Sequence, residues 1–319
     1  MRSINLVKTS LPLVMLVAIA SAVNLPLKPG CPEPIDVQPC TCESSQYTVL
    51  ECNQVDDTQI LKNVFQNSTK HGFREVHIQF SVLQYLPYEI FEKVPIESLY
   101  LKNTTLIQLF DRPPRALEGL DTLHLESAKL MRGVVWRLLE PLTHLRILNV
   151  YYNSIKTLGL DFSKYATKEL EQISFYATET KSIKPGTFVD FVKLNKVAFD
   201  ECKLTSLTRD IFPNPFNVQV LHFNRNKLTT IPDDLFSHMP RLQTVGLRYN
   251  QIAVIPATAF LDSFSKIEWL MLEGNPIICD CRLWWLIKNK PLALSGKCEL
   301  PTMLHGKEIK DVDVDYLQC

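Results

Sequence analysis

The stretch that decides the fold is Val218-Gln-Val-Leu-His-Phe-Asn-Arg-Asn-Lys-Leu-Thr-Thr-Ile-Pro-Asp-Asp-Leu-Phe236, whose apolar pattern returns from Leu242 to Phe260. Each copy is apolar at positions 1, 4, 6, 11, 14 and 19, with Asn at position 9 and Pro at position 15. Positions 4 and 6 alternate with more polar neighbours, which predicts a strand with one buried and one open face. The Asn can then satisfy backbone groups where the chain turns.

Nine copies of this unit follow one another at a period of 23 to 25 residues. Counted from their first apolar position, they begin at Phe73, Ile96, Leu120, Leu145, Leu170, Leu194, Val218, Leu242 and Ile267. A fixed period of this length indicates a solenoid in which each repeat buries its apolar face against its neighbours. Five copies have Phe at position 19, where a fully buried ring contributes roughly 1.5–3 kcal/mol. These are Phe91, Phe188, Phe212, Phe236 and Phe260.

The core motif L-x-x-L-x-L-x-x-N-x-L resembles that of leucine-rich repeat proteins. The resemblance implies an α/β solenoid, a horseshoe whose parallel strands line the concave face. Position 9 keeps its asparagine in only part of the chain, at Asn153, Asn226, Asn250 and Asn275, whereas Ala128 offers no side-chain hydrogen bond there. We therefore expect less regular coils in the N-terminal half, with short helical turns on the outer side of some repeats only.

Residues 1–22 have the features of a secretory signal peptide. Arg2 and Lys8 flank the front of an apolar run, Leu11 to Ala20, whose shortness disfavours the alternative of an uncleaved anchor helix. Cleavage removes both cations and no acidic residue, so the 34 basic residues become 32 against 34 acidic ones. A near-neutral chain disfavours electrostatic binding to nucleic acid or membrane surfaces. No second apolar stretch of about 20 residues occurs, so we expect a secreted, extracellular protein without a membrane span.

The nine cysteines form two clusters of four, with one residue between the clusters. The clusters are Cys31, Cys40, Cys42 and Cys52, and Cys279, Cys281, Cys298 and Cys319. Both suit caps that cover the apolar ends of a solenoid. Zinc sites are disfavoured because neither cluster has paired C-x2-C spacing and the expected compartment preserves disulfides. The sequence alone allows three disulfide connectivities in each cluster.

Both clusters resemble the caps of extracellular leucine-rich repeat proteins. Residues 31–52 contain Cys-Pro-x-Pro followed by Cys-x-Cys, and the C-terminal cluster begins Asn275-Pro276-x-x-Cys279-Asp280-Cys281. The resemblance implies the pairs Cys31 with Cys42, Cys40 with Cys52, Cys279 with Cys298 and Cys281 with Cys319. We accordingly expect a signal peptide (1–22), an N-terminal cysteine cap (23–72), leucine-rich repeats (73–274) and a C-terminal cysteine cap (275–319).

Three further positions bear on chemistry outside the caps. Cys202 lies at position 9, where Cys can replace Asn, so we expect a buried structural thiol; intermolecular pairing or a reactive thiol is the alternative. Asn67-Ser-Thr69 and Asn103-Thr-Thr105 are N-glycosylation sequons, with non-use as the alternative. Asn103 lies at position 8, so a glycan there would crowd the N-terminal part of the open face.

No catalytic or cofactor site is visible in the sequence. Nucleophile-elbow, phosphate-loop and H-E-x-x-H motifs are all missing. His77, His124 and His222 share position 5. Even the first two are two repeats apart, about 10 Å at a strand spacing of ~4.8 Å, which is too far to share a metal ion. We expect neither enzyme activity nor a metal or other cofactor.

The open strand face is the candidate binding surface. Its positions 2, 3, 5, 7 and 8 include residue types that dominate interface hot spots, namely Tyr100, Tyr151, Tyr152, Tyr176, Arg225, Arg248, Tyr249 and Trp269. The alternative is that open strands favour aromatic residues through β propensity alone. Tyr151, Tyr152 and Tyr176 are the strongest candidates because their rings come from adjacent repeats.

Two functions from different classes fit these features. The first is a secreted, non-enzymatic recognition or scaffold protein that binds a protein or glycoprotein partner on its concave face. The second is a non-catalytic subunit that stabilises or carries a secreted enzyme. For the second, Cys31-Pro-Glu-Pro-Ile-Asp and the overall layout are similar to secreted arthropod proteins resembling the non-catalytic subunit of the decapod shrimp luciferase. Co-purification from the native source would distinguish the two.

Overall fold

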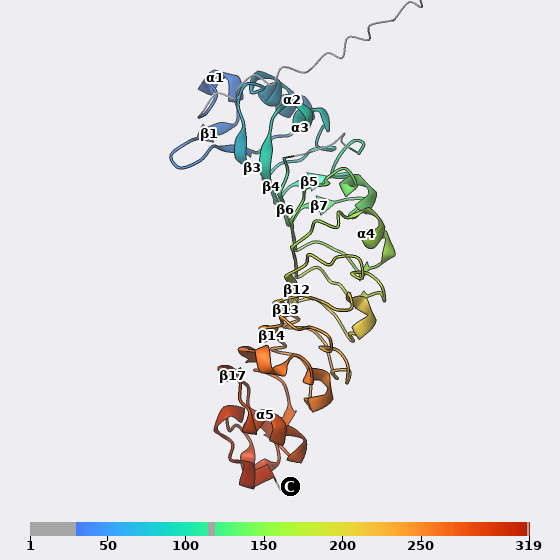
Figure 1. Cartoon of the computed structure of the whole chain (residues 1–319). Coiled ribbons are helices and arrows are strands. Elements are labelled where there is room, and N and C mark those ends of the chain that lie inside the picture. Colours follow the sequence, from blue (N-terminus) through green and yellow to red (C-terminus); the bar gives the residue numbers. More distant parts are fainter. Residues whose placement is uncertain (1–29, 114–118, 318) are drawn as a thin grey trace, which may run out of the picture.

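The computed structural model describes residues 30–113, 119–317 and 319. Its repeats stack into a curved solenoid with strands along the inner side of the curve and short helices on the outer side (Figure 1). The predicted signal peptide, residues 1–22, lies outside the described residues. Within the described ranges, none of the helices combines the length and apolarity needed to cross a bilayer.

Twelve strands of the described chain form one sheet that runs the length of the solenoid. In order across the sheet they are β1 (Thr41–Glu43), β2 (Val49–Asn53), β3 (Phe73–Gln79), β4 (Ile96–Lys102), β6 (Thr122–Glu126), β8 (Ile147–Tyr151), β10 (Gln172–Tyr176), β12 (Lys196–Asp200), β13 (Val220–His222), β14 (Thr244–Gly246), β15 (Trp269–Met271) and β17 (Ala293–Ser295). Neighbours are parallel, except that β1 and β2 form an antiparallel pair. The leucine-rich repeat solenoid predicted from the sequence period is confirmed.

Buried leucines fix the register of the sheet. Leu99, Leu123 and Leu148, all at position 4, are paired across β4, β6 and β8, and each is fully buried. A slip of one residue would turn this apolar row to solvent, so the alternating pattern permits only one register. The sheet also extends into both caps, because β2 pairs with β3 and β17 pairs with β15. Neither of these two cap strands was predicted from the sequence.

The asparagines of position 9 connect successive turns. Asn250 Oδ1 accepts from the Leu228 N–H at 3.1 Å, and its Nδ2 donates to the Phe223 carbonyl at 2.9 Å. Asn275 forms the same pair of bonds one repeat later. Ala128 is buried at this position without such bonds, yet β6 remains paired with both β4 and β8. The irregularity expected around Ala128 therefore does not reach the sheet.

Phenylalanines fill the space between the sheet and the outer segments. The five predicted at position 19 are all buried. Phe188 and Phe212 stack with their ring centroids 6.1 Å apart, and Phe236 and Phe260 lie 4.7 Å apart. In these two pairs the ring of one repeat contacts the ring of the next, which continues the core from repeat to repeat.

The outer segments change type along the chain, and helical turns appear in only some repeats, as predicted. The α-helices are α1 (Pro34–Val37), α2 (Thr58–Asn67), α3 (Glu89–Lys93), α4 (Leu160–Tyr165) and α5 (Trp284–Lys288). Two-stranded parallel sheets pair β5 (Thr105–Leu106) with β7 (Lys129–Leu130), β9 (Thr157–Leu158) with β11 (Ser182–Ile183), and β16 (Ile277–Ile278) with β18 (Cys298–Leu300). Single 3₁₀ turns span Trp136–Leu139, Arg209–Ile211, Ala257–Phe260, Phe264–Lys266, Cys281–Leu283, Thr302–Leu304, Ile309–Asp311 and Val314–Leu317.

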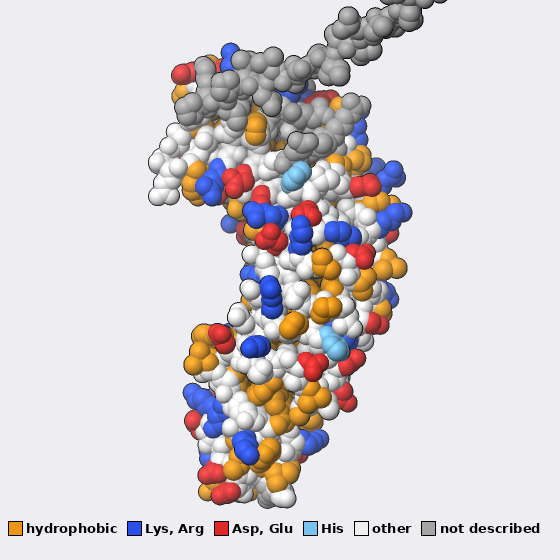
Figure 2. All heavy atoms as spheres, in the orientation of Figure 1, with side chains coloured by type: hydrophobic (Ala, Val, Ile, Leu, Met, Phe, Trp, Pro, Cys, Tyr) orange, Lys and Arg blue, Asp and Glu red, His pale blue; other side chains and the backbone are white. Residues whose placement is uncertain are grey.

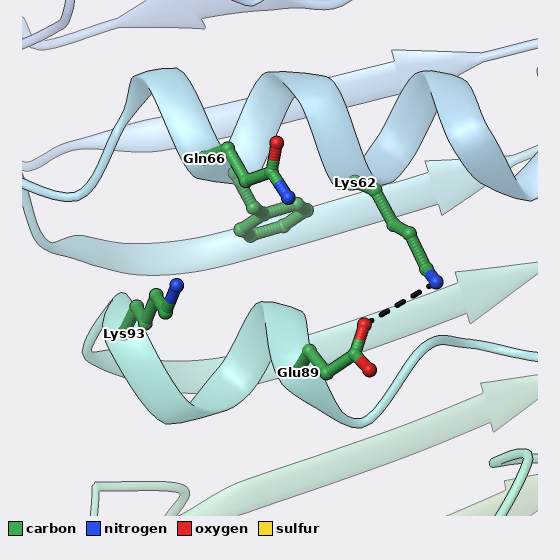
Figure 3. A pocket seen from close by; sticks show the side chains of 5 residues that line it. Lys62, Gln66, Glu89 and Lys93 are labelled. Atoms are coloured by element: carbon green, nitrogen blue, oxygen red, sulfur yellow. Dashed lines mark ion pairs between the residues drawn. The ribbon is translucent and has the colours of Figure 1, made fainter.

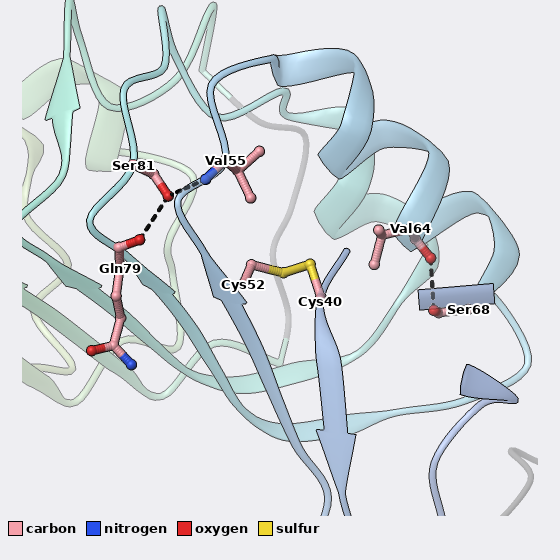
Figure 4. The surroundings of a disulfide bond; sticks show 7 residues. All are labelled: Cys40, Cys52, Val55, Val64, Ser68, Gln79 and Ser81. Atoms are coloured by element: carbon pink, nitrogen blue, oxygen red, sulfur yellow. Dashed lines mark hydrogen bonds between the residues drawn. A yellow bond between two sulfur atoms is a disulfide. The ribbon is translucent and has the colours of Figure 1, made fainter. Parts of the chain in front are cut away.

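A disulfide closes the N-terminal cap on itself, and a hydrogen bond joins the cap to the first repeat (Figure 4). A disulfide between Cys40 and Cys52 connects the start of the cap hairpin to β2. Ser81, at position 9 of the first repeat, accepts from the Val55 N–H at 2.9 Å and donates to the Gln79 carbonyl at 2.8 Å. A serine therefore performs part of the asparagine's role at the junction between cap and repeat.

The C-terminal cap packs an aromatic side chain against the eighth repeat, which begins at Leu242. The Trp285 ring on α5 lies 5.4 Å from the Phe260 ring, and its Nε1–H donates to the Ile255 carbonyl at 3.3 Å. The structure contains the disulfides Cys31–Cys42, Cys40–Cys52, Cys279–Cys298 and Cys281–Cys319, the pairs that the family resemblance implied. Cys202 is a free thiol and is buried.

Candidate partner-binding surface

Six rings form a continuous row on the concave face. His77 on β3, Tyr100 on β4 and His124 on β6 occupy directly paired positions of the sheet. The centroid distances are 4.5 Å for His77–Tyr100, 5.5 Å for Tyr100–His124, 4.8 Å for His124–Tyr151, 5.9 Å for Tyr151–Tyr176 and 5.3 Å for Tyr152–Tyr176. We call these residues (His77, Tyr100, His124, Tyr151, Tyr152 and Tyr176) the ring row. It spans five neighbouring strands.

The structure extends the tyrosine group that the sequence predicted. Tyr151, Tyr152 and Tyr176 are in contact, and Tyr100 joins them through His124. Position 5 placed both histidines on the open face, but they were not among the predicted partner-binding residues. His124 occupies position 5 and Tyr151 occupies position 7 of the next repeat, so their contact depends on side-chain direction and not on repeat position alone.

Tyr152 stands at the rim of the face because its backbone is left-handed. Its φ is 56°, and the residue is 54% exposed. Position 8 of every repeat has a positive φ, at Phe80, Asn103, Ser127, Tyr152, Ala177, Glu201, Arg225, Tyr249 and Gly274. Residues other than glycine pay of order 1–3 kcal/mol for such a backbone. Gly274 and, to a lesser degree, Asn103 are residue types that favour this conformation, so residue type does not predict it at the other seven positions.

A hollow opens on the concave face beside the tyrosines. It has a volume of about 420 Å³, and its lining includes Tyr151, Tyr176, Lys196, Asp200 and His222. Binding sites usually combine aromatic walls with a few placed polar groups, as this hollow does. It is open to solvent along the sheet, which suits a protruding side chain of a macromolecular partner.

The protonation states of the ring row follow from its surroundings. A hydrogen bond with Glu201, assisted by burial, raises the pKa of Tyr176 to about 12. Burial also raises the pKa of Tyr100 and of Tyr151. Burial lowers the pKa of the His124 imidazole. At neutral pH these four side chains are therefore uncharged, and the tyrosines keep their hydroxyl hydrogens for donation.

Asp200 and His222 form the polar floor of the hollow. Asp200 Oδ1 accepts from the Asn224 N–H at 2.7 Å, and its Oδ2 lies 3.9 Å from His222 Nδ1. Burial raises the pKa of Asp200 and lowers that of His222. The His222 ring occupies this place only because residue 246 is a glycine. A Cβ at Gly246 would lie 2.9 Å from His222 Cδ2.

Side chains at position 7 take over backbone pairing toward the C-terminus. Asp200 Oδ1 receives the Asn224 N–H, and Asn224 Oδ1 receives the Arg248 N–H at 2.9 Å. These amides would otherwise extend the strand ladder to position 7, so β13 and β14 end at position 5, whereas β12 reaches position 7. Side-chain oxygens of Asp200 and Asn224 thus accept the backbone N–H groups that strand pairing would otherwise use. These polar side chains lie in a row on the concave face.

A second cluster lies near the C-terminal end of the face. The Arg225 guanidinium is 4.2 Å from the Tyr249 ring centroid, and Arg248 Nε is 2.8 Å from Glu273 Oε2. Trp269 on β15 is 48% exposed. β15 is four strands from β10 in the sheet, about 19 Å at a spacing of ~4.8 Å. Trp269 is thus well separated from the ring row, whereas Arg225 reaches toward it, because its Nε lies 3.5 Å from Oε1 of Glu201, the hydrogen-bond partner of Tyr176.

The two sequon asparagines are accessible. Asn67 ends α2 and is exposed, and its side chain contacts the Asp36 carbonyl at 3.4 Å. Asn103 is exposed at position 8 with φ 47°, three residues after Tyr100 of the ring row. Asn67 lies on the cap, so only Asn103 borders the concave face.

Elsewhere the described residues offer little that resembles an enclosed site. A cavity of about 20 Å³ lies between α2 and α3 beside the Lys62–Glu89 ion pair at 3.2 Å (Figure 3), enough for a water molecule but not for a ligand. Within the described ranges, no three His, Cys, Asp or Glu side chains are grouped to hold a metal ion. His77 and His124, which share position 5, are kept apart by the ring of Tyr100 between them. Acidic and basic side chains are interspersed on the face seen in Figure 2.

Comparison with known proteins supports the repeat architecture. Residues 192–252 and 216–277 match the leucine-rich repeat family. The chain is similar to the leucine-rich repeat and immunoglobulin-like domain-containing nogo receptor-interacting protein 1 of Xenopus tropicalis, with 35% identity over 65 residues, 18% of this chain and 11% of that protein. The protein of the same name from Gallus gallus is 37% identical over 62 residues, 17% of this chain and 10% of that protein.

The form named 1-B from Danio rerio is 39% identical over 62 residues, again 17% of this chain and 10% of that protein. Each match covers about a tenth of the relative's length. These proteins are leucine-rich repeat proteins named for an interaction with a receptor.

Proposed function

We propose that this capped leucine-rich repeat protein is secreted and binds a protein or glycoprotein partner on its concave face, without chemistry of its own. The observation that carries the proposal is the ring row, whose six side chains contact one another across five strands on the side of the sheet that the core does not use. Similarity to proteins named for receptor interaction supports a protein partner. The disulfide caps support an oxidising compartment.

The ring row has the chemistry of an interface anchor. Tyrosine combines a large apolar ring with a hydroxyl, so it can lose water on binding and still satisfy its polar tip. Tyr151 and Tyr176 line the hollow together with Lys196 and Asp200. A protruding partner side chain would bury against the rings, while the two charges would fix its orientation.

The Arg225–Tyr249 pair and Trp269 form a second contact area for the same partner. A protein interface of standard size buries about 800 Å² on each side, so a partner can reach from the ring row across Arg225 to Trp269, ~19 Å from β10. Arg225 lies over the Tyr249 ring and is thereby held in place before binding. Less side-chain entropy is then lost on association.

Glycosylation at Asn103 would set the N-terminal limit of the binding surface. Asn103 borders the strand that carries Tyr100, and its side chain is exposed at the rim. A glycan there leaves Tyr151, Tyr152 and Tyr176 open, because they lie two or three strands further along the sheet. A glycan at Asn67 would lie on the cap and leave the concave face free.

Site-specific photo-crosslinking in the native extracellular fluid tests the proposal. A photoreactive phenylalanine analogue is placed at Tyr152, which is 54% exposed on the concave rim, or at Tyr316, which is 48% exposed in the C-terminal cap. We expect the Tyr152 probe to capture one partner in stoichiometric yield and the Tyr316 probe to capture little. Equal capture at both positions would contradict a concave site.

The captured partner also separates the two functions that fit the sequence. A receptor, ligand or matrix protein supports recognition as the function. A stable stoichiometric enzyme instead supports the role of a non-catalytic carrier subunit. Both use the same surface, so the identity of the partner decides between them.

A further inference from the structure

The edge of the solenoid where the chain leaves the sheet is strongly basic. We call positions 10–15 of the five repeats that begin at Leu120 to Val218 the exit edge, comprising residues 129–134, 154–159, 179–184, 203–208 and 227–232. Seven basic residues occur there against one acidic residue, Glu179. Six are exposed lysines: Lys129, Lys156, Lys181, Lys184, Lys203 and Lys227. The whole chain has 34 basic and 34 acidic residues, so this excess is local.

Backbone hydrogen bonds align these lysines along the solenoid axis. The Lys181 N–H donates to the Lys156 carbonyl at 2.9 Å, beside the paired residues of β9 and β11. The Lys203 N–H donates to the Thr180 carbonyl, and the Lys227 N–H donates to the Leu204 carbonyl, each at 2.8 Å. The lysines from 156 to 227 therefore come from four consecutive turns, about 15 Å from first to last at ~4.8 Å per turn.

At the opposite edge of the solenoid, where the chain enters the strands, basic side chains form ion pairs with acidic ones. There Arg74 Nε lies 3.7 Å from Glu97, Arg146 pairs with both Asp121 and Glu171, and Lys193 pairs with Glu169 at 2.5 Å. These pairs join neighbouring repeats. On the exit edge, Lys203 pairs with Glu179 at 2.7 Å.

The other exit-edge lysines lack such partners. Lys129, Lys156, Lys181, Lys184 and Lys227 have no carboxylate within 4.0 Å among the residues that the structure describes. Like charges placed side by side on neighbouring strands are destabilising. Lys156 and Lys181 are placed in this way, and Glu179, whose pKa Lys156 helps to lower, is already paired with Lys203. An external anion bound along the row would remove that repulsion.

We propose that the exit edge binds a sulfated polysaccharide running along the solenoid axis. The lysines follow one another from turn to turn along the solenoid axis, at positions 10, 12 and 15 of the repeats, which suits a linear polyanion. Hydroxyls alternate with the lysines, at Ser154, Thr157, Ser182, Thr205 and Thr229, and can exchange hydrogen bonds with sugar hydroxyls. The exit edge has no aromatic residue, although single-stranded nucleic acids are generally held by stacking on aromatic rings.

The test uses heparin as the probe and a charge-matched pair of variants. The triple variant Lys156→Gln, Lys181→Gln and Lys227→Gln removes three positive charges from the exit edge without breaking an ion pair. The control variant Lys70→Gln, Lys266→Gln and Lys310→Gln removes three exposed charges elsewhere. Both change the net charge equally, so only position differs. Dissociation constants are measured by calorimetry against heparin, desulfated heparin of equal length and a single-stranded DNA oligonucleotide.

We expect the exit-edge variant to bind heparin at least tenfold more weakly near 0.15 M salt, with the slope of log affinity against log salt reduced by about three. The control variant, and Tyr151→Ala on the concave face, should bind like wild type. This last comparison keeps heparin binding separate from partner binding. Equal losses in both triple variants, no heparin binding by wild type, or equally tight binding of the DNA or the desulfated chain would overturn the proposal.

Discussion

The ring of Tyr249 occupies the space that a side chain at Gly274 would need. A Cβ added to Gly274 would lie 2.9 Å from Tyr249 Cε1 and closer still to Cδ1. Both residues lie at position 8 of consecutive repeats and have positive φ values, 53° and 73°. The glycine thus allows Tyr249 to lie flat along the rim, where Arg225 covers its ring. The lack of a side chain at Gly274 therefore determines where the Tyr249 ring lies in the C-terminal part of the candidate surface.

The first prediction is that Gly274→Ala destabilises the fold through this contact. The matched control is Gly133→Ala, because Gly133 has nearly the same φ, 72°, with no atom within 4 Å of an added Cβ. Backbone strain alone should cost the control about 1 kcal/mol. The clash should cost Gly274→Ala about 1–3 kcal/mol more. Urea unfolding measures both, and equal losses would mean that Tyr249 moves aside freely.

A second prediction concerns the asparagine ladder. Asn250→Ala leaves the buried Leu228 N–H and the Phe223 carbonyl without their side-chain partner. Each buried unpaired group costs about 1–3 kcal/mol, so we expect a loss of at least 2 kcal/mol. The exposed neighbour variant Gln251→Ala should change stability by less than about 0.5 kcal/mol. Similar melting temperatures for the two variants would show that water replaces the ladder.

The repeat architecture could be predicted because it rests on side chains that recur. The apolar period fixed the strand starts, and position 9 identified the buried asparagines of the C-terminal repeats. The cap strands β2 and β17 could not be predicted in this way. Each joins the sheet through backbone pairing at the end of the stack, where no repeat pattern is present.

The candidate site was predictable in part, for a related reason. Tyr151 and Tyr176 share a position in adjacent repeats, so the repeat period alone brings them together. The contact of His124 with Tyr151 joins two different positions. The positive φ at position 8 is imposed by the turn and tolerated by residues as unlike as Phe80, Tyr152 and Arg225, so their identities carry no signal.

A third prediction concerns the thiol of Cys202. Burial raises the pKa of this thiol, and Thr178 Oγ1 lies 3.2 Å from its Sγ. Only the thiolate reacts with alkylating agents, so labelling in the folded state should be slow near pH 8 and should accelerate at higher pH or on unfolding. Mass mapping under non-reducing conditions should give four intrachain disulfides and one modified residue, Cys202. A disulfide from Cys202 to a cap would contradict the arrangement.

A fourth prediction follows from the lowered pKa of His124, which burial causes. Below the ordinary histidine pKa of about 6.5, the unfolded chain binds a proton that folded His124 resists, so stability should fall as the pH drops. Glu126 opposes this shift, whereas Lys102 and His77 reinforce it. Between about pH 7.5 and 5.5, His124→Phe should lose less unfolding free energy than wild type.

His222 titrates in the same direction, so part of the pH dependence should remain in that variant. The control Trp269→Phe, which removes no titratable group, should keep the wild-type pH dependence. Identical pH profiles for wild type and His124→Phe would show that this ring is not protected from protonation.

The affinity of the partner for tyrosine variants tests the central claim most directly. We predict that Tyr151→Ala and Tyr176→Ala each weaken binding by at least about thirtyfold, equivalent to ~2 kcal/mol, with the unfolding free energy almost unchanged. The matched control Tyr316→Ala, in the C-terminal cap, should bind like wild type. Wild-type affinity in both concave variants, or a loss of affinity that tracks a loss of stability, would contradict a binding site on the ring row.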